Sequence, residues 1–265
     1  MIDAVLERIG LRTLPDPDLD GLFALHRAYL ETVPYEDLAV QLGETGPLDF
    51  GMLASRLVSG RGGYCFELNT ILAGLLRACG FQVTQHQAVV GGEGPVNHMA
   101  LLVELDGETW LADAGLGEGF LDPLPFREGA HEVGPFSWTL ADEGESWWLT
   151  HHEWGTFSGF RMALAPATVA DFEEHHRRLS TSPDSSFVKT LVLQKPAADR
   201  ITTLRSRTLT SIGPAVDTKH VVADVDEFTA TLLDVFGVSI AGERRDRLWA
   251  QALVQHEAFL SREAA

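Results

Sequence analysis

The stretch Arg61-Gly62-Gly63-Tyr64-Cys65-Phe66-Glu67-Leu68-Asn69 places one cysteine behind two glycines and at the head of a helical pattern. The apolar residues of this pattern recur with the spacing of one buried helix face: Leu68, Ile71, Leu72, Leu75, Leu76 and Cys79. This predicts a helix over residues 65–79, with Gly80 as its C-terminal cap. Cys65 then lies in or just before the first turn, where the helix dipole favours a thiolate over a thiol. We therefore predict that Cys65 is a nucleophile.

A β-hairpin is predicted around Asp106-Gly107, with strands over residues 98–105 and 108–114. If these two residues form the whole loop, His98 and Asp113 lie on the same face of the hairpin as diagonal neighbours. Diagonal neighbours are about 7–8 Å apart at the backbone, within reach of a hydrogen bond between an imidazole and a carboxylate. A three-residue loop would instead put Asp113 on the opposite face.

Cys65, His98 and Asp113 supply the residue types that nucleophilic catalysis requires. A thiol needs a base or an imidazolium beside it to exist as a thiolate at neutral pH. The imidazole needs a carboxylate on its other nitrogen to fix its tautomer. The hairpin joins the histidine to the aspartate but does not show that His98 reaches Cys65. A small buried apolar residue remains the alternative interpretation of Cys65.

Composition argues against several classes of function. The 265-residue chain has a formal net charge of −18, which argues against nucleic acid and anionic membranes as partners. No apolar run is long enough to span a bilayer, and the start Met1-Ile2-Asp3-Ala4 lacks the basic residues of a signal peptide, so a cytoplasmic location is expected. Two cysteines are too few for a disulfide framework, and Cys79 is expected in the core. Without a CxxC or HExxH motif, no metal is expected.

The order of predicted elements is helical first, then β-rich, then mixed. The helices are expected over residues 2–11, 19–32, 49–58, 65–79, 171–178, 226–236 and 243–263. The strands are expected over residues 81–90, 98–105, 108–114, 187–193 and 201–210, with several short strands between 120 and 165. The short central strands favour a barrel or a sandwich. The Trp and Phe residues between 136 and 160 are expected in its core.

Other candidate groups are weaker. The adjacent pairs His151-His152 and His175-His176 are predicted to be solvated, because adjacent side chains point apart in strands and do not stack on helices. The loop Gly115-Leu116-Gly117-Glu118-Gly119 follows Asp113, and its glycines could let backbone amides meet a ligand. One segment is rich in basic residues, and it is interpreted either as a solvated face or as a phosphate contact. Its basic residues are Lys189, Lys195, Arg200, Arg205 and Arg207.

Residues 61–69 match the RGGxCxExN signature of the arylamine N-acetyltransferases, and the chain resembles that family along nearly its whole length. His98 and residues 110–117 resemble its histidine and DVGFG segments. The further segments that resemble the family are 6–11, 33–38 (its IPFENL turn), 121–124 and 180–187 (its STxPxSxF stretch).

The resemblance implies an α+β fold with a cysteine-protease-like catalytic core. A helical bundle over residues 1–85 would carry the catalytic Cys65, a central antiparallel β-barrel over 86–186 would carry His98 and Asp113, and an α/β lid would span 187–265. The implied reaction is a ping-pong transfer of acetyl from acetyl-CoA, through a Cys65 thioester, to an arylamine, arylhydrazine or N-hydroxyarylamine. Bound CoA would lie between barrel and lid, near the glycines at 115–117, with Gly117 as a contact.

The resemblance implies that Tyr35, Leu116 and Phe187 line the acceptor pocket. Tyr35 and Leu116 stand where the family usually has Phe, whereas Phe187 is retained. Leucine removes a stacking face for an aromatic amine, so we expect a weaker preference for flat arylamines.

Two other uses of the same cysteine stay open. An amide synthase of polyketide biosynthesis would take a carrier-bound acyl chain, and a thioesterase would use water as the acceptor. The complete triad argues against a degenerate CoA- or carrier-binding module. The oligomeric state is left open.

Overall fold

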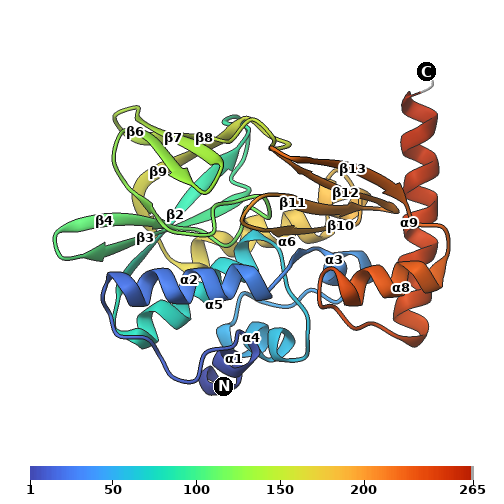
Figure 1. Cartoon of the computed structure of the whole chain (residues 1–265), viewed down its shortest axis with the longest axis horizontal. Helices are drawn as coiled ribbons and strands as arrows, with labels where there is room; N and C mark the ends of the chain where they lie inside the picture. The colour runs from blue at the N-terminus through green and yellow to red at the C-terminus, as the bar shows by residue number, and fades with distance from the viewer. Residues whose placement is uncertain (264–265) are drawn as a thin grey trace.

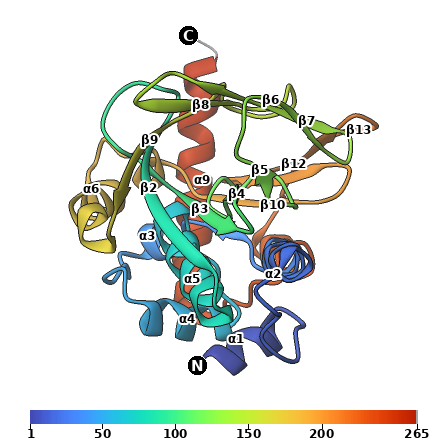
Figure 2. The same ribbon diagram turned by 90° about the vertical axis from the view of Figure 1, so that its left-hand side faces the viewer.

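Two antiparallel sheets organise the computed structural model, which describes residues 1–263. The larger sheet has eight strands in the order β5-β4-β3-β2-β9-β8-β7-β6 and curls into a nearly closed barrel, confirming the predicted barrel and α+β class. The smaller sheet has the order β1-β10-β11-β12-β13. Figure 1 and Figure 2 show α1, α2, α4 and α5 on one side of the barrel, and α9 beyond the smaller sheet.

The bounds of the elements are as follows. The helices are α1 (Ile2–Arg8), α2 (Leu19–Thr32), α3 (Leu38–Leu42), α4 (Phe50–Val58), α5 (Cys65–Cys79), η1 (Val169–Phe172), α6 (Glu173–Thr181), α7 (Ser186–Lys189), α8 (Val225–Asp234) and α9 (Gly242–Glu263). The strands are β1 (Tyr35–Glu36), β2 (Gln82–Val90), β3 (His98–Leu105), β4 (Glu108–Ala112), β5 (Leu124–Pro125), β6 (Gly129–Val133), β7 (Phe136–Asp142), β8 (Ser146–Thr150), β9 (Gly159–Ala167), β10 (Val192–Pro196), β11 (Ile201–Arg205), β12 (Thr208–Gly213) and β13 (Val216–Val221).

The two predictions on which the catalytic hypothesis depends are confirmed. Helix α5 covers the predicted range and ends at Gly80, whose φ of 102° is left-handed. The β3–β4 hairpin turns at Asp106 and Gly107, which both have positive φ, and Leu101 pairs with Ala112. The loop therefore has two residues, and this register places Asp113 on the same face as His98.

Two predicted strands are wrong. The segment 187–193 begins in α7, because the Ser185 hydroxyl accepts a hydrogen bond from the Phe187 amide and caps a helical turn; the strand starts only at Val192. The segment 201–210 is a hairpin, not one strand, because Ser206 adopts a left-handed φ of 53° and reverses the chain.

The division at residues 85 and 186 remains a proposal. The smaller sheet joins distant parts of the chain, because β1 pairs with β10, with Tyr35 opposite Gln194. The segment 33–38, expected as a turn, thus contributes a short strand to the sheet that the proposed lid occupies.

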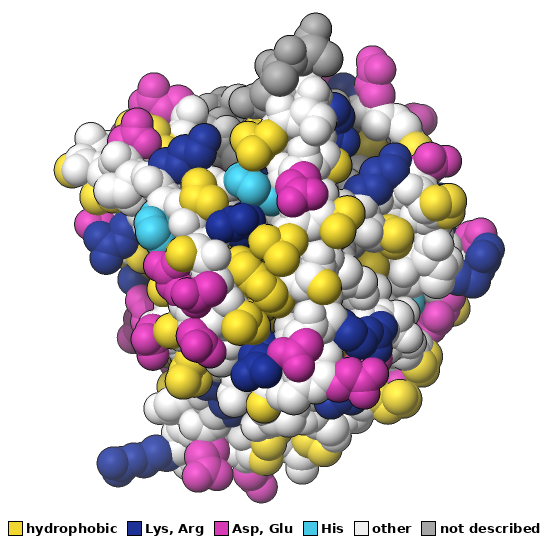
Figure 3. All heavy atoms as spheres, turned by 90° about the vertical axis from the view of Figure 1, so that its right-hand side faces the viewer, with side chains coloured by type: hydrophobic (Ala, Val, Ile, Leu, Met, Phe, Trp, Pro, Cys, Tyr) yellow, Lys and Arg dark blue, Asp and Glu magenta, His cyan; other side chains and the backbone are white. Residues whose placement is uncertain are grey.

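The outer side of α9 faces solvent. Figure 3 shows apolar and charged side chains interspersed on this face of the molecule, and Val254 and Leu260 are among the exposed apolar residues. None of the helices within residues 1–263 has the length and hydropathy that crossing a bilayer requires.

The prediction of a core position for the Trp and Phe residues between 136 and 160 is confirmed for three of them, whereas Trp147, Trp148, Trp154 and Phe157 are only partly buried. Phe136, Trp138 and Phe160 are buried in one apolar cluster. The expectation of solvated histidine pairs is wrong for His151 and His152, which are both buried with their rings 4.1 Å apart. The two residues follow β8 in a loop, where the alternation of a strand no longer separates neighbouring side chains.

The two residues of the second histidine pair, His175 and His176, differ in burial. His176 is buried and lies within hydrogen-bond distance of the Tyr64 hydroxyl and the Gly46 carbonyl, whereas His175 is only partly buried. The expectation of solvation is therefore wrong for His176 too.

The burial of His151 predicts a dependence of stability on pH. Burial, followed by the neighbouring His152, lowers the pKa of His151 to about 3. A lowered folded-state pKa leaves stability intact above the unfolded pKa, about 6.5, and reduces it as pH falls below that value. Between about pH 7.5 and pH 5, His151→Leu should lose about 2 kcal/mol less of its free energy of unfolding than the wild type. Urea unfolding at both pH values measures this, and equal losses would contradict it.

Candidate active site

The N-terminus of α5 is held by the residues that precede Cys65. The Arg61 guanidinium pairs with Glu36, with 2.8 Å between Nη2 and Oε1, and the Gly62 amide donates to the same carboxylate at 3.1 Å. A Cβ at Gly62 would lie 1.9 Å from the Pro34 carbonyl oxygen, so only glycine fits there. The turn before the helix is therefore fixed against β1, and it presents Cys65 as the first helical residue.

The carboxylate of Asp113 collects hydrogen bonds from three segments. Its Oδ2 lies 2.6 Å from His98 Nε2, and its Oδ1 accepts from the Asn69 amide group at 2.8 Å and from the Gly115 backbone N–H at 2.7 Å. The Asp113 backbone N–H donates to His26 Nε2 at 3.1 Å. Asp113 and Asn69 are fully buried. The predicted contact between His98 and Asp113 is thus present.

The contact with Asp113 determines which nitrogen of His98 carries a proton. An ionised carboxylate only accepts hydrogen bonds, so Nε2 is the donor. In the neutral ring Nδ1 is then unprotonated and available as a base. A carboxylate at Nε2 also stabilises the imidazolium that forms when Nδ1 takes up a proton.

Cys65 is buried, with only 1% of the residue exposed. Its Sγ donates to the Asn97 carbonyl oxygen at 3.2 Å. Burial raises the pKa of the Cys65 thiol well above its usual value, the Phe66 amide lowers it in part, and the charge of Asp113 raises it further. The N-terminus of α5 lowers the pKa of Cys65, as expected, but burial raises this pKa by more. Removing the thiol proton therefore requires a base beside Cys65.

Cys65 and His98 open onto one cavity of about 280 Å³, here called the inner cavity. The hairpin alone does not connect His98 to Cys65. The inner cavity does bring them to one place, because its lining includes the first residue of α5 and the first residue of β3. The residues that line the inner cavity are Tyr35, Cys65, Val90, Asn97, His98, Gly115, Leu116, Thr156, Phe157, Leu179, Ser186, Phe187, Thr190, Val192, Gln194 and Arg205.

The three residues implied to bind substrate, Tyr35, Leu116 and Phe187, all line the inner cavity. Gly117 does not line it. A Cβ at Gly117 would lie 2.4 Å from Gln194 Oε1 and 3.0 Å from Tyr35 Cγ, so this glycine packs behind the cavity wall. The roles of all four residues stay predictions.

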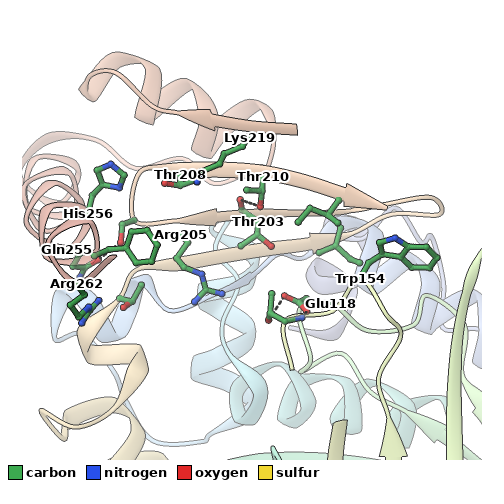
Figure 4. A pocket seen from close by; sticks show the side chains of 16 residues that line it. Glu118, Trp154, Thr203, Arg205, Thr208, Thr210, Lys219, Gln255, His256 and Arg262 are labelled. Atoms are coloured by element: carbon green, nitrogen blue, oxygen red, sulfur yellow. Dashed lines mark hydrogen bonds between the residues drawn. The ribbon is translucent and has the colours of Figure 1, made fainter. Parts of the chain in front are cut away.

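A second cavity of about 530 Å³, the outer cavity, lies over the smaller sheet. It shares Thr156, Thr190 and Arg205 with the inner cavity, so the two adjoin. Figure 4 shows the contributions of the three sides: the sheet with threonines and Lys219, α9 with His256, and the barrel loops with Trp154 and Glu118. The full lining is Glu118, Trp154, Thr156, Thr190, Ile201, Thr203, Arg205, Ser206, Thr208, Thr210, Ile212, Lys219, Gln255, His256, Phe259 and Arg262.

Sequence reasoning missed several residues of these cavities. Nothing local marked Thr156 or Gln194, which reach the site only through the tertiary fold. Asn97 precedes His98 directly, so its carbonyl could have been suspected as a neighbour of the thiol. Arg205 belongs to the basic segment singled out above, and it lines both cavities.

Comparisons with known proteins agree with this geometry. A family model described as N-acetyltransferase matches residues 18–245. An arylamine N-acetyltransferase from Escherichia coli is 30% identical over 237 residues, which cover 84% of this chain and 83% of that protein. An arylamine N-acetyltransferase / N-hydroxyarylamine O-acetyltransferase from Salmonella typhimurium is 34% identical over 177 residues, 62% of each chain.

Solved structures match along almost the whole chain. The arylamine N-acetyltransferase of Mycobacterium marinum in complex with CoA superposes with a TM-score of 0.87 at 27% identity, covering 95% of this chain and 98% of that one. The fold and site thus define an enzyme of the acyltransferase class. The chain belongs to the arylamine N-acetyltransferase family.

The close packing of Gly115 against α5 yields a prediction. A Cβ at Gly115 would lie 2.8 Å from Cys65 Cα and 2.9 Å from Asn69 Nδ2, and the backbone atom has little freedom to move. Gly115→Ala should cost about 1–3 kcal/mol of unfolding free energy through overpacking and slow acetyl transfer from acetyl-CoA to an arylamine. Urea unfolding and steady-state kinetics measure the two effects.

The matched control is Gly46→Ala, whose Cβ would meet only the flexible end of Met52 at 3.4 Å. If Gly115→Ala is as stable and as fast as this control, the close contact is not a constraint on the site.

Proposed function

We propose that this chain moves an acetyl group from acetyl-CoA, through a thioester on Cys65, to an arylamine, arylhydrazine or N-hydroxyarylamine. The observation that carries the proposal is the shared inner cavity: Cys65 opens onto it beside His98, whose far nitrogen contacts Asp113. The family supports the donor and acceptor classes, and the related Mycobacterium marinum structure holds CoA.

In the first half-reaction, His98 Nδ1 takes the thiol proton as Sγ leaves its hydrogen bond with Asn97. The thiolate attacks the acetyl carbonyl carbon, and the bond between that carbon and the CoA sulfur breaks. The CoA thiolate leaves with the proton that His98 held. The carboxylate of Asp113 stabilises the imidazolium while it exists.

In the second half-reaction, the amine nitrogen attacks the carbonyl carbon of the Cys65 thioester. His98 accepts a proton from the nitrogen and returns it to the departing sulfur, so Cys65 ends as a thiol. Burial raises the pKa of the Cys65 thiol, so the proposed base favours its ionisation in each turnover.

The outer cavity is the proposed site for the remainder of CoA. Its lining includes Arg205, Lys219 and Arg262, and guanidinium and ammonium groups suit the phosphates of this ligand. Arg205 reaches both cavities, so it lies on the path between the phosphates and the thiol.

The proposal is tested by intact-protein and peptide mass spectrometry after mixing with acetyl-CoA alone. We expect an acetyl adduct on Cys65 that an added arylamine or hydrazine discharges, and no adduct on Cys65→Ala. An adduct with only longer or carrier-bound acyl thioesters would instead support the amide-synthase alternative. Discharge by water as fast as by amine would support a thioesterase, and the absence of any adduct would contradict acyl transfer.

The leucine at position 116 predicts the preference for acceptors. Leu116 lines the inner cavity where an aromatic ring would offer a stacking face. Leu116→Phe should lower the KM for flat anilines by about 3- to 10-fold, because one aromatic pair strengthens binding by about that factor. Acylation by acetyl-CoA should stay unchanged. Steady-state kinetics with aniline and an aliphatic hydrazine measure the ratio. A variant that gains nothing on anilines, or gains equally on both acceptors, would contradict this role.

A further inference from the structure

Glu118 is a buried carboxylate that the reaction above does not use. It lies in the glycine-rich loop that follows Asp113, and only 1% of the residue is exposed. Its Oε2 accepts from the Thr156 backbone N–H at 2.7 Å. Its Oε1 accepts from the Thr156 hydroxyl at 2.8 Å and from Gln194 Nε2 at 2.5 Å. No ion pair of residues 1–263 includes it.

A buried carboxylate without a cation is costly unless donors replace the water that it loses. Here the donors come from two different segments, the loop of residues 151–158 (the β8–β9 loop) and strand β10. The backbone of the same residue adds a further contact, because the Glu118 carbonyl accepts from His152 Nε2 at 3.1 Å. Residue 118 thus holds the β8–β9 loop near both of its ends.

The β8–β9 loop forms part of the wall of both cavities. Thr156 lines the inner and the outer cavity, Phe157 lines the inner one, and Trp154 lines the outer one. Figure 4 shows Glu118 beside the outer cavity, near Trp154. The position of this loop therefore determines how the two cavities meet.

We propose that Glu118 is a positioning residue that holds the β8–β9 loop and β10 together, so that a CoA thioester can extend from the outer cavity to Cys65. The proposal rests on the proposed function for the ligand of the outer cavity. The hydrogen bonds of the Glu118 carboxylate to Thr156 and Gln194, here called the clamp, are seen in the structure and do not depend on the proposed function.

Glu118→Gln is the most specific first variant, because it keeps the shape of the side chain and replaces one acceptor oxygen with an NH2 donor. The new NH2 group then faces the Thr156 backbone N–H, which is a donor, or replaces the oxygen that accepts from Gln194 Nε2; in the second case the Gln194 amide must turn over to accept, and in both cases a charge-assisted hydrogen bond is lost. We expect the KM for acetyl-CoA to rise by about tenfold, the loss expected for one charge-assisted hydrogen bond. Acylation of Cys65 by p-nitrophenyl acetate, a small donor that does not need the outer cavity, should fall by a smaller factor than transfer from acetyl-CoA.

The double variant Glu118→Gln with Gln194→Glu supplies the rescue. The amide at position 118 can accept from Thr156 through its oxygen and donate through its nitrogen to the carboxylate at position 194. We expect it to recover most of the KM for acetyl-CoA, whereas Gln194→Glu alone should be as impaired as Glu118→Gln, because two carboxylates then face each other. Glu153→Gln is the control, since it makes the same change at an exposed position of the same loop.

Hydrogen exchange supplies a readout that is independent of activity. In Glu118→Gln the peptide containing Thr156 should exchange faster, with β3 unchanged, and the double variant should restore its protection. If the wild type transfers nothing from acetyl-CoA, the proposed function fails while exchange still tests the clamp. Exchange and KM like the wild type, or equal losses with both donors that the double variant does not rescue, would overturn the proposal.

Discussion

The hydrogen bonds to the buried carboxylate of Asp113 couple the fold to the site. Full burial of this charge is tolerable only because donors surround it. Asn69 comes from α5, His98 from β3, and Gly115 from the loop that follows Asp113 itself. The helix and the barrel must therefore be docked before the carboxylate is satisfied. The same docking orients the His98 ring, so stability and catalytic geometry depend on one set of contacts.

Glycine provides the second constraint, because α5 and the loop after Asp113 approach one another at backbone distance. A side chain at Gly115 would meet Cys65 Cα at 2.8 Å, and one at Gly62 would meet the Pro34 carbonyl at 1.9 Å. This packing places Sγ in the same cavity as His98, but it also buries the thiol and raises its pKa. Close positioning and easy ionisation thus oppose each other at Cys65, and in the proposed mechanism His98 takes the thiol proton.

The sequence predicted what local rules determine. Helix 65–79 follows from apolar spacing, and the contact of His98 with Asp113 follows from a two-residue hairpin loop. The cavity that Cys65 and His98 share, and the hydrogen bonds of Glu118 to Thr156 and Gln194, join segments far apart in the chain, so no local pattern could reveal them. Buried histidines were mispredicted for the same reason, since a residue type does not say which loop or which helix face packs inward. The strand expected from 187 failed locally, at an unrecognised cap on Phe187.

A chain with a formal net charge of −18 repels a ligand that carries several phosphates, so a CoA thioester requires a local reversal of charge. The outer cavity has such a reversal in Arg205, Lys219 and Arg262, whereas the inner cavity has Arg205 alone among lysines and arginines. In the proposed ping-pong reaction the same sulfur meets a large anionic donor and then a small acceptor. Two adjoining cavities that differ in positive charge suit that sequence, because the phosphates of the donor are favoured at the outer cavity.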